Sequence, residues 1–209
     1  MDVLIPVAVV LASYLVGSLS FAVIVSRLMG LNDPRSYGSK NPGATNVLRS
    51  GSKKAAILTL LLDAFKGWLP VALVLSRGAD QGMGPEVAAL AGLAAFLGHL
   101  YPIFFGFAGG KGVATAVGVV LGVHSSLALA TLLSFAVILY FSRYVSLASM
   151  VAAVFAPVYY LLGDGVVWQA SVSEVLCLSV MALLLIWRHR ENIQRLLAGT
   201  ESRLGSKKA

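Results

Sequence analysis

Long apolar segments constrain this chain more than any other feature of its sequence. A helix needs about 20 apolar residues to cross the hydrocarbon core of a bilayer, and several stretches of the 209-residue chain reach that length. Only 12% of the residues are charged, whereas soluble domains carry about 25%. The sequence therefore predicts an all-α, polytopic membrane protein, with residues 1–209 forming a single integral-membrane domain.

One apolar stretch, residues 113–141, is too long for a single span. As one helix it would extend about 43 Å at about 1.5 Å per residue, against a hydrocarbon core of about 30 Å. The polar run His124-Ser125-Ser126 interrupts it, so we expect two helices that meet there, the first of them short. One long helix is the alternative, which leaves the number of spans open between five and seven. The seven predicted spans cover residues 3–26, 55–76, 86–107, 113 to the break, the break to 141, 147–163 and 167–187.

Seven spans put the two termini on opposite sides of the membrane, and the cations indicate which side is which. Lys and Arg exceed Asp and Glu by 16 − 9 = 7. The positive-inside rule explains this surplus without a nucleic-acid partner. Fourteen of the sixteen cations fall on the side of the first loop, the loops at 108–112 and 142–146, and the tail at 188–209. That side is predicted to be cytoplasmic, with the N-terminus outside.

The segment at residues 38–49 is the strongest candidate for a binding site. Pro42 and Gly43 prevent a continuous helix here, so backbone N–H groups are left unpaired. Together with hydroxyls, amides and a guanidinium, these groups suit an anion, above all a phosphate. A solvated turn between two spans is the alternative. The candidate binding residues are Ser39, Asn41, Gly43, Thr45, Asn46 and Arg49.

A second candidate is the loop Gly109-Gly110-Lys111-Gly112, which directly precedes a predicted helix. Glycines let the backbone approach a ligand closely, Lys111 supplies a charge, and helix N-termini attract phosphate. The second, fourth and sixth predicted helices all begin on this side. The loop is not a Walker A motif, because Phe105 occupies its first glycine position and Gly112 replaces the Ser or Thr. The alternative is a basic loop that merely obeys the positive-inside rule.

The basic tail holds a third candidate pair. His189 and Asn192 are three residues apart, which places them on one face of a helix. An amphipathic helix lying on anionic lipid would explain the cations of the tail, but it gives no reason for this pair. We therefore expect His189 and Asn192 to be functional.

Asp63 and Lys66 also lie three residues apart, within a predicted span. Charges inside a membrane are costly and usually functional. Mutual neutralisation is the competing explanation and the one that we favour, with the pair acting as a strut that orients the loops. His99, in the next predicted span, is expected to be a packed polar residue rather than a catalytic one.

Several signatures of catalysis are absent from the sequence. No histidine begins a His-x-x-x-x-Asp acyltransferase motif, and Gly-x-Ser-x-Gly is missing. The cytoplasmic side offers no cluster of carboxylates for Mg²⁺, and no His/Cys spacing suits zinc. The lone Cys177 cannot form an intrachain disulfide. We expect no metal, no cofactor, and no protein nucleophile with an adjacent base.

Taken together, these motifs resemble the bacterial acyl-phosphate:glycerol-3-phosphate acyltransferases, integral-membrane enzymes of phospholipid biosynthesis. The resemblance covers almost the whole chain in order. Lys40 departs from the family pattern, where glycine is expected. The matching residues are Gly17-Ser18, Ser20-Phe21, Gly38-Ser39, Asn41 to Asn46, Arg49, Asp63, Lys66-Gly67, Gly98-His99, Pro102, Gly109 to Gly112, Ala114-Thr115, Ser146, His189-Arg190 and Asn192-Ile193.

This resemblance implies a seven-helix protein of the bacterial cytoplasmic (inner) membrane with its site facing the cytoplasm. The implied reaction transfers a fatty acyl group from acyl phosphate to the 1-hydroxyl of glycerol 3-phosphate, giving lysophosphatidic acid and phosphate. Membrane lipid surrounds the protein, and the soluble enzyme that forms acyl phosphate is a candidate partner. By the same resemblance, Ser39, Lys111 and the backbone at Gly43, Gly109 and Gly110 hold phosphate, and Arg49, Lys111, Ser146, His189 and Asn192 hold glycerol 3-phosphate.

The absence of a nucleophile–base pair fits such a reaction. An acyl phosphate is already activated, and its leaving phosphate can accept the hydroxyl proton, so the protein need only position the substrates and stabilise charge. We expect direct transfer, with His189 as a base the alternative. A transporter of small anions or lipids is a different possibility, favoured by the intramembrane charges. Transporters hold their ligands near the bilayer midplane, however, whereas the polar residues here gather at one surface.

Overall fold

Helices make up nearly all the regular structure of this chain. The computed structural model describes residues 3–205, and over that range the only β-type pairing is an isolated bridge between Asp164 and Trp168. The predicted all-α class is confirmed. In chain order the helices are α1 Leu4–Gly17, α2 Phe21–Leu28, α3 Ala44–Leu48, α4 Lys53–Arg77, η1 Ala79–Gln81, α5 Pro85–Leu100, η2 Ile103–Phe105, α6 Val113–Val123, α7 Ser125–Ser142, α8 Val145–Leu162, α9 Val172–Arg188 and α10 Arg190–Leu197.

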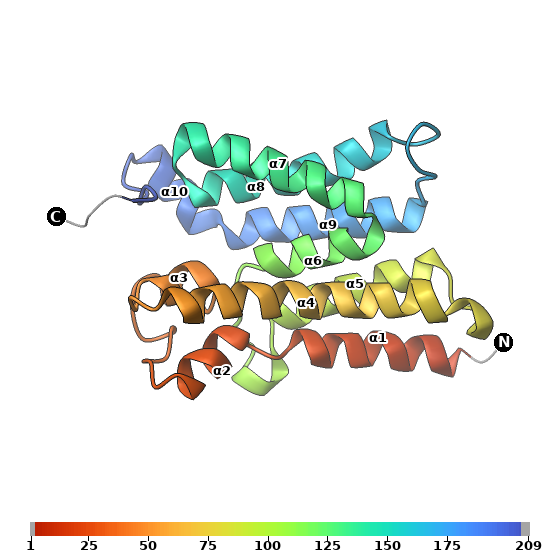
Figure 1. Ribbon diagram of the computed structural model, residues 1–209, viewed down its shortest axis with the longest axis horizontal. Helices are drawn as coiled ribbons and strands as arrows, with labels where there is room; N and C mark the ends of the chain where they lie inside the picture. The colour runs from red at the N-terminus through yellow and green to blue at the C-terminus, as the bar shows by residue number, and fades with distance from the viewer. Residues whose placement is uncertain (1–2, 206–209) are drawn as a thin grey trace.

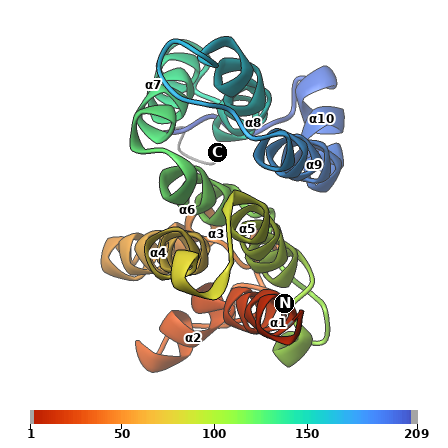
Figure 2. The same cartoon turned by 90° about the vertical axis from the view of Figure 1, so that its right-hand side faces the viewer.

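The helices form two groups with α6 between them. Helices α1, α2, α4 and α5 lie on one side of α6, and α7, α8 and α9 lie on the other (Figure 1, Figure 2). Helices α4, α6 and α8 all begin at the same end of the molecule, as predicted, and α10 lies there too (Figure 1). We call this end the site end; it comprises residues 38–49, 109–112, 143–146 and 188–205. The first turn of α1 lies at the opposite end.

Several helices are long and apolar enough to cross a membrane. Within residues 3–205, α4, Pro85–Phe105, α7 and α8 qualify alone. Two bent pairs raise the number to six if each is one span: α1 with α2, bent by 45°, and α9 with α10, bent by 56°. Helix α6 has 11 residues, or about 17 Å, which is short of the hydrocarbon thickness. The structure thus supplies four to six candidate spans, and the count of seven stays a prediction.

The predicted break in the long apolar stretch is confirmed. Helix α6 ends at Val123, and α7 begins at Ser125 after His124, which has extended backbone. The predicted span at 86–107 corresponds to the candidate span Pro85–Phe105, which consists of two helices, because α5 stops at Leu100 and η2 follows. Pro102 explains this, since the residue before a proline is driven out of the helical conformation, and Tyr101 has φ −133° and ψ 67°.

The predicted first span is likewise divided into α1 and α2. The helical bonds are interrupted at Ser18–Ser20, and the side-chain ammonium of Lys66 donates to the carbonyl of Leu19 at 2.7 Å. Lys66 also pairs with Asp63 at 2.8 Å, and both side chains are buried. The expected mutual neutralisation is confirmed. The pair therefore joins α4 to the break between α1 and α2.

Candidate active site

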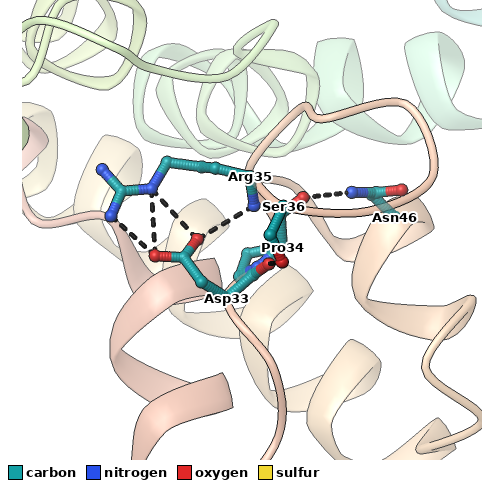
Figure 3. A network of polar contacts seen from close by, with 5 residues as sticks. All are labelled: Asp33, Pro34, Arg35, Ser36 and Asn46. Carbon is teal, nitrogen blue, oxygen red and sulfur yellow. Dashed lines mark hydrogen bonds and ion pairs between the residues drawn. The ribbon is translucent and has the colours of Figure 1, made fainter.

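Asn46 holds the loop at residues 38–49 through its side-chain amide, and Figure 3 shows its hydrogen bond to the carbonyl of Pro34. Its side chain is buried, and its amide nitrogen donates to the carbonyls of Pro34, at 2.6 Å, and Tyr37, at 3.2 Å. Its amide oxygen accepts from the backbone N–H of Ser39 at 3.0 Å and from Arg49 at 3.4 Å. An amide has two donor hydrogens and two acceptor lone pairs, so all are used within the loop. Asn46 was predicted to bind substrate; in the structure its side chain holds neighbouring residues of its own loop, and substrate contact stays a prediction.

Replacing Asn46 should therefore lower the stability of the protein, and lower its activity as a consequence. Asn46→Ala leaves buried carbonyl groups without partners, at about 1–3 kcal/mol each. We expect a lower melting temperature in detergent and activity reduced about tenfold or more. Thr45→Ala, at an exposed neighbour in α3, is the matched control and should melt like wild type. Equal melting temperatures for Asn46→Ala and wild type would contradict the assigned role.

The glycine loop packs against His99 at the end of α5. The N–H of Gly110 donates to the carbonyl of His99 at 3.2 Å. A Cβ atom on Gly110 would lie 2.3 Å from the Nε2 atom of His99 and 2.9 Å from the carbonyl oxygen of Pro42. Arg188 donates to the carbonyls of Gly109, at 2.7 Å, and Gly110, at 3.1 Å. The two candidate loops thus touch at Gly110 and Pro42, and only glycine fits there.

His99 belongs to the buried polar cluster beneath this loop. Its Nδ1 lies 3.1 Å from the hydroxyl of Thr115 and 3.6 Å from a carboxylate oxygen of Asp63. The ring edge that carries Nε2 faces Gly110. His99 is a packed polar residue, as expected, and through Asp63 and Lys66 it ties the glycine loop to α4 and to the break between α1 and α2.

Asn192 and Ser146 both bind the carboxylate of Glu201, and Lys111 is joined to it through Asn192. Lys111 donates to the amide oxygen of Asn192. The amide nitrogen of Asn192 donates to Glu201 at 2.6 Å, and the hydroxyl of Ser146 donates to the same oxygen at 2.7 Å. Arg195 pairs with the other oxygen of Glu201 at 2.7 Å. Three predicted site residues from three distant segments are therefore brought together.

Burial sets the charges in this cluster. It lowers the pKa of Lys111 to about 8, with the positive charge of Arg195 adding to the effect. Burial opposes ionisation of Glu201, but hydrogen bonds from Ser146, Asn192 and Arg195 outweigh it and hold the pKa of the Glu201 carboxyl below its ordinary value. Near pH 7 the site therefore contains an ammonium that is mostly charged and a carboxylate.

His189 is buried at the bend between α9 and α10. Its Nδ1 lies 2.8 Å from the carbonyl oxygen of Leu185. A carbonyl only accepts, so Nδ1 carries the proton and Nε2 has the free lone pair. Burial lowers the pKa of His189 to about 4, so the ring is neutral near pH 7 and offers an acceptor.

The remaining predicted residues lie around this cluster with fewer contacts. Arg49 is exposed, and it reaches the hydroxyl of Ser202 at 3.4 Å, next to Glu201. This contact joins residues 38–49 to the C-terminal segment. Ser39 and Thr45 are exposed, Asn41 and Gly43 are partly buried, and the structure does not bring these four side chains or backbone groups into the Lys111 cluster.

Two residues of the site were missed by reasoning from the sequence. Arg188 binds the carbonyls of the glycine loop, and Glu201 collects the donors of the cluster. Arg188 directly precedes the predicted pair in the tail, and Glu201 is an acid within a basic segment. Neither signal reveals a partner, because the partners lie in other segments of the chain.

An apolar pocket that is partly open to the outside lies between α6, α7, α8 and α9. Val113, Ser149 and Leu185 line it at the site end, and each is within four positions of Lys111, Ser146 or His189 along the chain. Val120, Ala156 and Leu178 line it farther into the bundle. The polar cluster therefore adjoins an apolar pocket that runs into the bundle.

Comparison with known proteins agrees with this geometry. The family model described as glycerol-3-phosphate acyltransferase matches residues 7–199. Among curated relatives, the glycerol-3-phosphate acyltransferase of Albidiferax ferrireducens is 67% identical over 97% of this chain and 90% of its own length. That of Bordetella petrii is 62% identical over 96% of this chain and 94% of its own length.

Two solved structures share the fold. Both are crystal structures of PlsY, an integral membrane glycerol 3-phosphate acyltransferase. The glycerol 3-phosphate form is 43% identical, with a TM-score of 0.87 over 96% of both chains. The lysophosphatidic acid form is 42% identical, with a TM-score of 0.85 over 96% of this chain and 95% of the other. With its apolar helices and its donor-rich site, this chain belongs to the glycerol-3-phosphate acyltransferase family of multi-pass membrane proteins.

Proposed function

We propose that this protein transfers a fatty acyl group from an acyl phosphate to the 1-hydroxyl of glycerol 3-phosphate, forming lysophosphatidic acid and inorganic phosphate. The observation that carries the proposal is the site itself, where cations, N–H donors and neutral acceptors converge. Ser146 donates to Glu201, but that carboxylate is a poor base, because its hydrogen bonds hold its pKa below the ordinary value. An acyl donor that is already activated needs no protein nucleophile. Binding the substrates and stabilising the developing charge are enough to catalyse the transfer.

The charges suggest where the substrates bind. Lys111 and Arg49 are cations of the site that form no ion pair with a carboxylate within residues 3–205, and the glycine loop adjoins Lys111. These groups suit the phosphates of the two substrates. The neutral His189 suits a hydroxyl of the glycerol part. Ser39, Asn41, Gly43 and Thr45, which edge the adjoining loop, are proposed to complete the phosphate sites.

The apolar pocket is proposed to hold the fatty acyl chain. Its end near Ser149 and Leu185 adjoins Ser146 and His189, so a chain lying in the pocket would present its carbonyl group to the polar cluster. The apolar lining matches a hydrocarbon chain, so the chain can lie there without losing the apolar surroundings that it has in the bilayer. The cations are left free to act on the reacting phosphate.

We propose a direct transfer. The 1-hydroxyl oxygen attacks the acyl carbonyl carbon, the bond from that carbon to the phosphate oxygen breaks, and the leaving phosphate takes the hydroxyl proton. Lys111 stabilises the negative charge that develops. With its pKa lowered to about 4, His189 is a weak base, which favours the phosphate over His189 as the proton acceptor.

The remaining predictions on topology are retained as part of the proposal. Seven crossings would place the site end in the cytoplasm of a bacterium, at the inner membrane, where the basic tail meets anionic lipid. The soluble enzyme that produces acyl phosphate would then deliver the donor to this face. The whole chain would act as one domain.

Lipid analysis with purified protein tests the proposed reaction. Wild type in detergent is supplied with glycerol 3-phosphate and either palmitoyl phosphate or palmitoyl-CoA. We expect lysophosphatidic acid from palmitoyl phosphate and none from palmitoyl-CoA. Equal product from both donors would contradict the proposed donor, and no product from either, with folded protein, would contradict the reaction.

The pKa of Lys111 predicts how the reaction depends on pH. Because this pKa is about 8, Lys111 loses its charge as the pH rises through that value. We expect kcat/KM for glycerol 3-phosphate to fall above about pH 8, since this parameter reports the free enzyme. Lys111→Arg keeps its charge and should lose this alkaline decline, whatever its absolute rate. The same decline in both proteins would exclude Lys111 as its source.

A further inference from the structure

The carboxylate of Glu201 accepts hydrogen bonds from three side chains, more than are needed to hold a C-terminal segment in place. Its side chain is 6% exposed, although the segment around it lies at the surface. One carboxylate oxygen accepts from both Ser146 and Asn192, and the other accepts from Arg195. Farther along, the N–H of Leu204 donates to the carbonyl of Arg143 at 2.7 Å, so the segment stays closed over the cluster.

These bonds fix the direction of the neighbouring hydrogen bonds. An ionised carboxylate can only accept, so the single proton of the Ser146 hydroxyl points to Glu201. What Ser146 offers to a ligand is therefore a lone pair. The amide of Asn192 is oriented in the same way, with its nitrogen toward Glu201 and its oxygen toward Lys111.

This direction decides which ligand group Ser146 can bind. A phosphate oxygen is an acceptor and gains nothing from a second acceptor, whereas a hydroxyl can donate to Ser146. Resting on the proposed function, we propose that Glu201 is a positioning residue that makes Ser146 the hydrogen-bond acceptor for the 2-hydroxyl of glycerol 3-phosphate. Ser146 thereby distinguishes glycerol from a simpler alcohol, and Lys111 and Arg49 remain for phosphate.

The fate of its proton decides which hydroxyl of glycerol 3-phosphate is assigned to Ser146. The 1-hydroxyl must give up its proton during transfer, and a proton passed to Ser146 would have to continue to Glu201. Arg195 neutralises that carboxylate, and three hydrogen bonds stabilise its ionised form. The non-reacting hydroxyl, which keeps its proton, is therefore the partner that suits Ser146.

A preference between two substrates tests this proposal. The probe is 3-hydroxypropyl phosphate, which keeps the reacting hydroxyl and the phosphate of glycerol 3-phosphate but lacks the 2-hydroxyl. The ratio of kcat/KM for the two substrates is measured with palmitoyl phosphate as donor. Both substrates are assayed with the same enzyme preparation, so the ratio of their kcat/KM values does not depend on the fraction of folded enzyme. Wild type should prefer glycerol 3-phosphate by about tenfold or more.

Three variants give the decisive comparison. Ser146→Ala should reduce the preference about tenfold, Glu201→Ala should reduce it to a similar extent, and the double variant should reduce it no further, since Glu201 acts through Ser146. An unchanged preference in Ser146→Ala or in Glu201→Ala, or additive losses in the double variant, would overturn the proposal. If Glu201→Ala does not fold, Glu201→Asp, whose carboxylate is shorter by one carbon, takes its place.

Glu191→Ala is the matched control. Glu191 is an exposed acid in α10 that, like Glu201, acts on Lys111 through its charge, so removing it changes the charge near Lys111 without touching Ser146. Its preference should equal that of wild type; a loss there as large as in Glu201→Ala would assign the effect to charge and contradict the positioning role. If wild type makes no lysophosphatidic acid, the proposed function fails. If it does so without any preference, only this inference fails.

Discussion

Lys111→Ala should lower kcat/KM for glycerol 3-phosphate by about 10²–10³-fold, the range found when one preorganised donor at a developing charge is removed. The effect is large because the ammonium is mostly buried and its charge is poorly screened there. Lys111 contacts Asn192 and no acid directly, so the truncation leaves no buried carboxylate without its pair. We expect the variant to fold and to melt near the wild-type temperature.

Lys54→Ala is the control for this experiment. Lys54 lies in the first turn of α4, also on the basic side of the protein, and is exposed. Its removal lowers the net charge by the same amount, so a general effect of charge on substrate attraction would appear in both variants. We expect Lys54→Ala to stay within about twofold of wild type, as is usual for surface positions. Equal losses in the two variants would show that Lys111 has no special role.

Gly110→Ala should reduce activity almost as strongly as Lys111→Ala does. A methyl group at this position would lie 2.3 Å from the Nε2 atom of His99 and 2.9 Å from the carbonyl oxygen of Pro42, and a buried ring and a backbone carbonyl cannot move aside cheaply. The loop must shift instead, which displaces Lys111, its neighbour. A displacement of about 1 Å at a reacting centre costs about 10²-fold in rate.

Gly30→Ala separates crowding from backbone strain. Gly30 has φ +68°, and a Cβ atom there meets nothing within 4 Å, so alanine brings strain alone, about 1–2 kcal/mol. We expect a lower melting temperature with nearly unchanged kcat for Gly30→Ala, and loss of kcat for Gly110→Ala. Normal kcat in Gly110→Ala would show that the glycine loop tolerates movement and does not position Lys111.

The sequence predicted the helices where local signals are strong. The polar run at His124 marked the break between α6 and α7, and the structure has it there. The break between α1 and α2 was not predicted, because Ser18-Leu19-Ser20 contains neither Gly nor Pro. The break depends on Lys66. Its ammonium group, which comes from α4, donates to the carbonyl of Leu19, a group that has no helical partner at the break.

In the site, too, residues with a local sequence signal were predicted, whereas contacts between distant parts of the chain were not. Residue type and spacing identified Lys111 and Asn192, the family resemblance added Ser146, and the structure connects the three. Glu201 could not be found in this way, because its bond to Ser146 joins residues 55 positions apart. Asn46 was predicted to bind substrate because amides suit anions. Residue type alone does not say whether an amide faces a ligand or, as here, the carbonyls of its own loop.

The central claim is that this site joins two substrates directly, without a covalent acyl-enzyme, and isotope exchange tests it most simply. Purified protein is incubated with palmitoyl phosphate and labelled inorganic phosphate, without glycerol 3-phosphate. Direct transfer predicts no label in palmitoyl phosphate and no phosphate release in proportion to enzyme. Label entering palmitoyl phosphate, or one equivalent of phosphate released per enzyme, would reveal an acyl-enzyme and contradict the account.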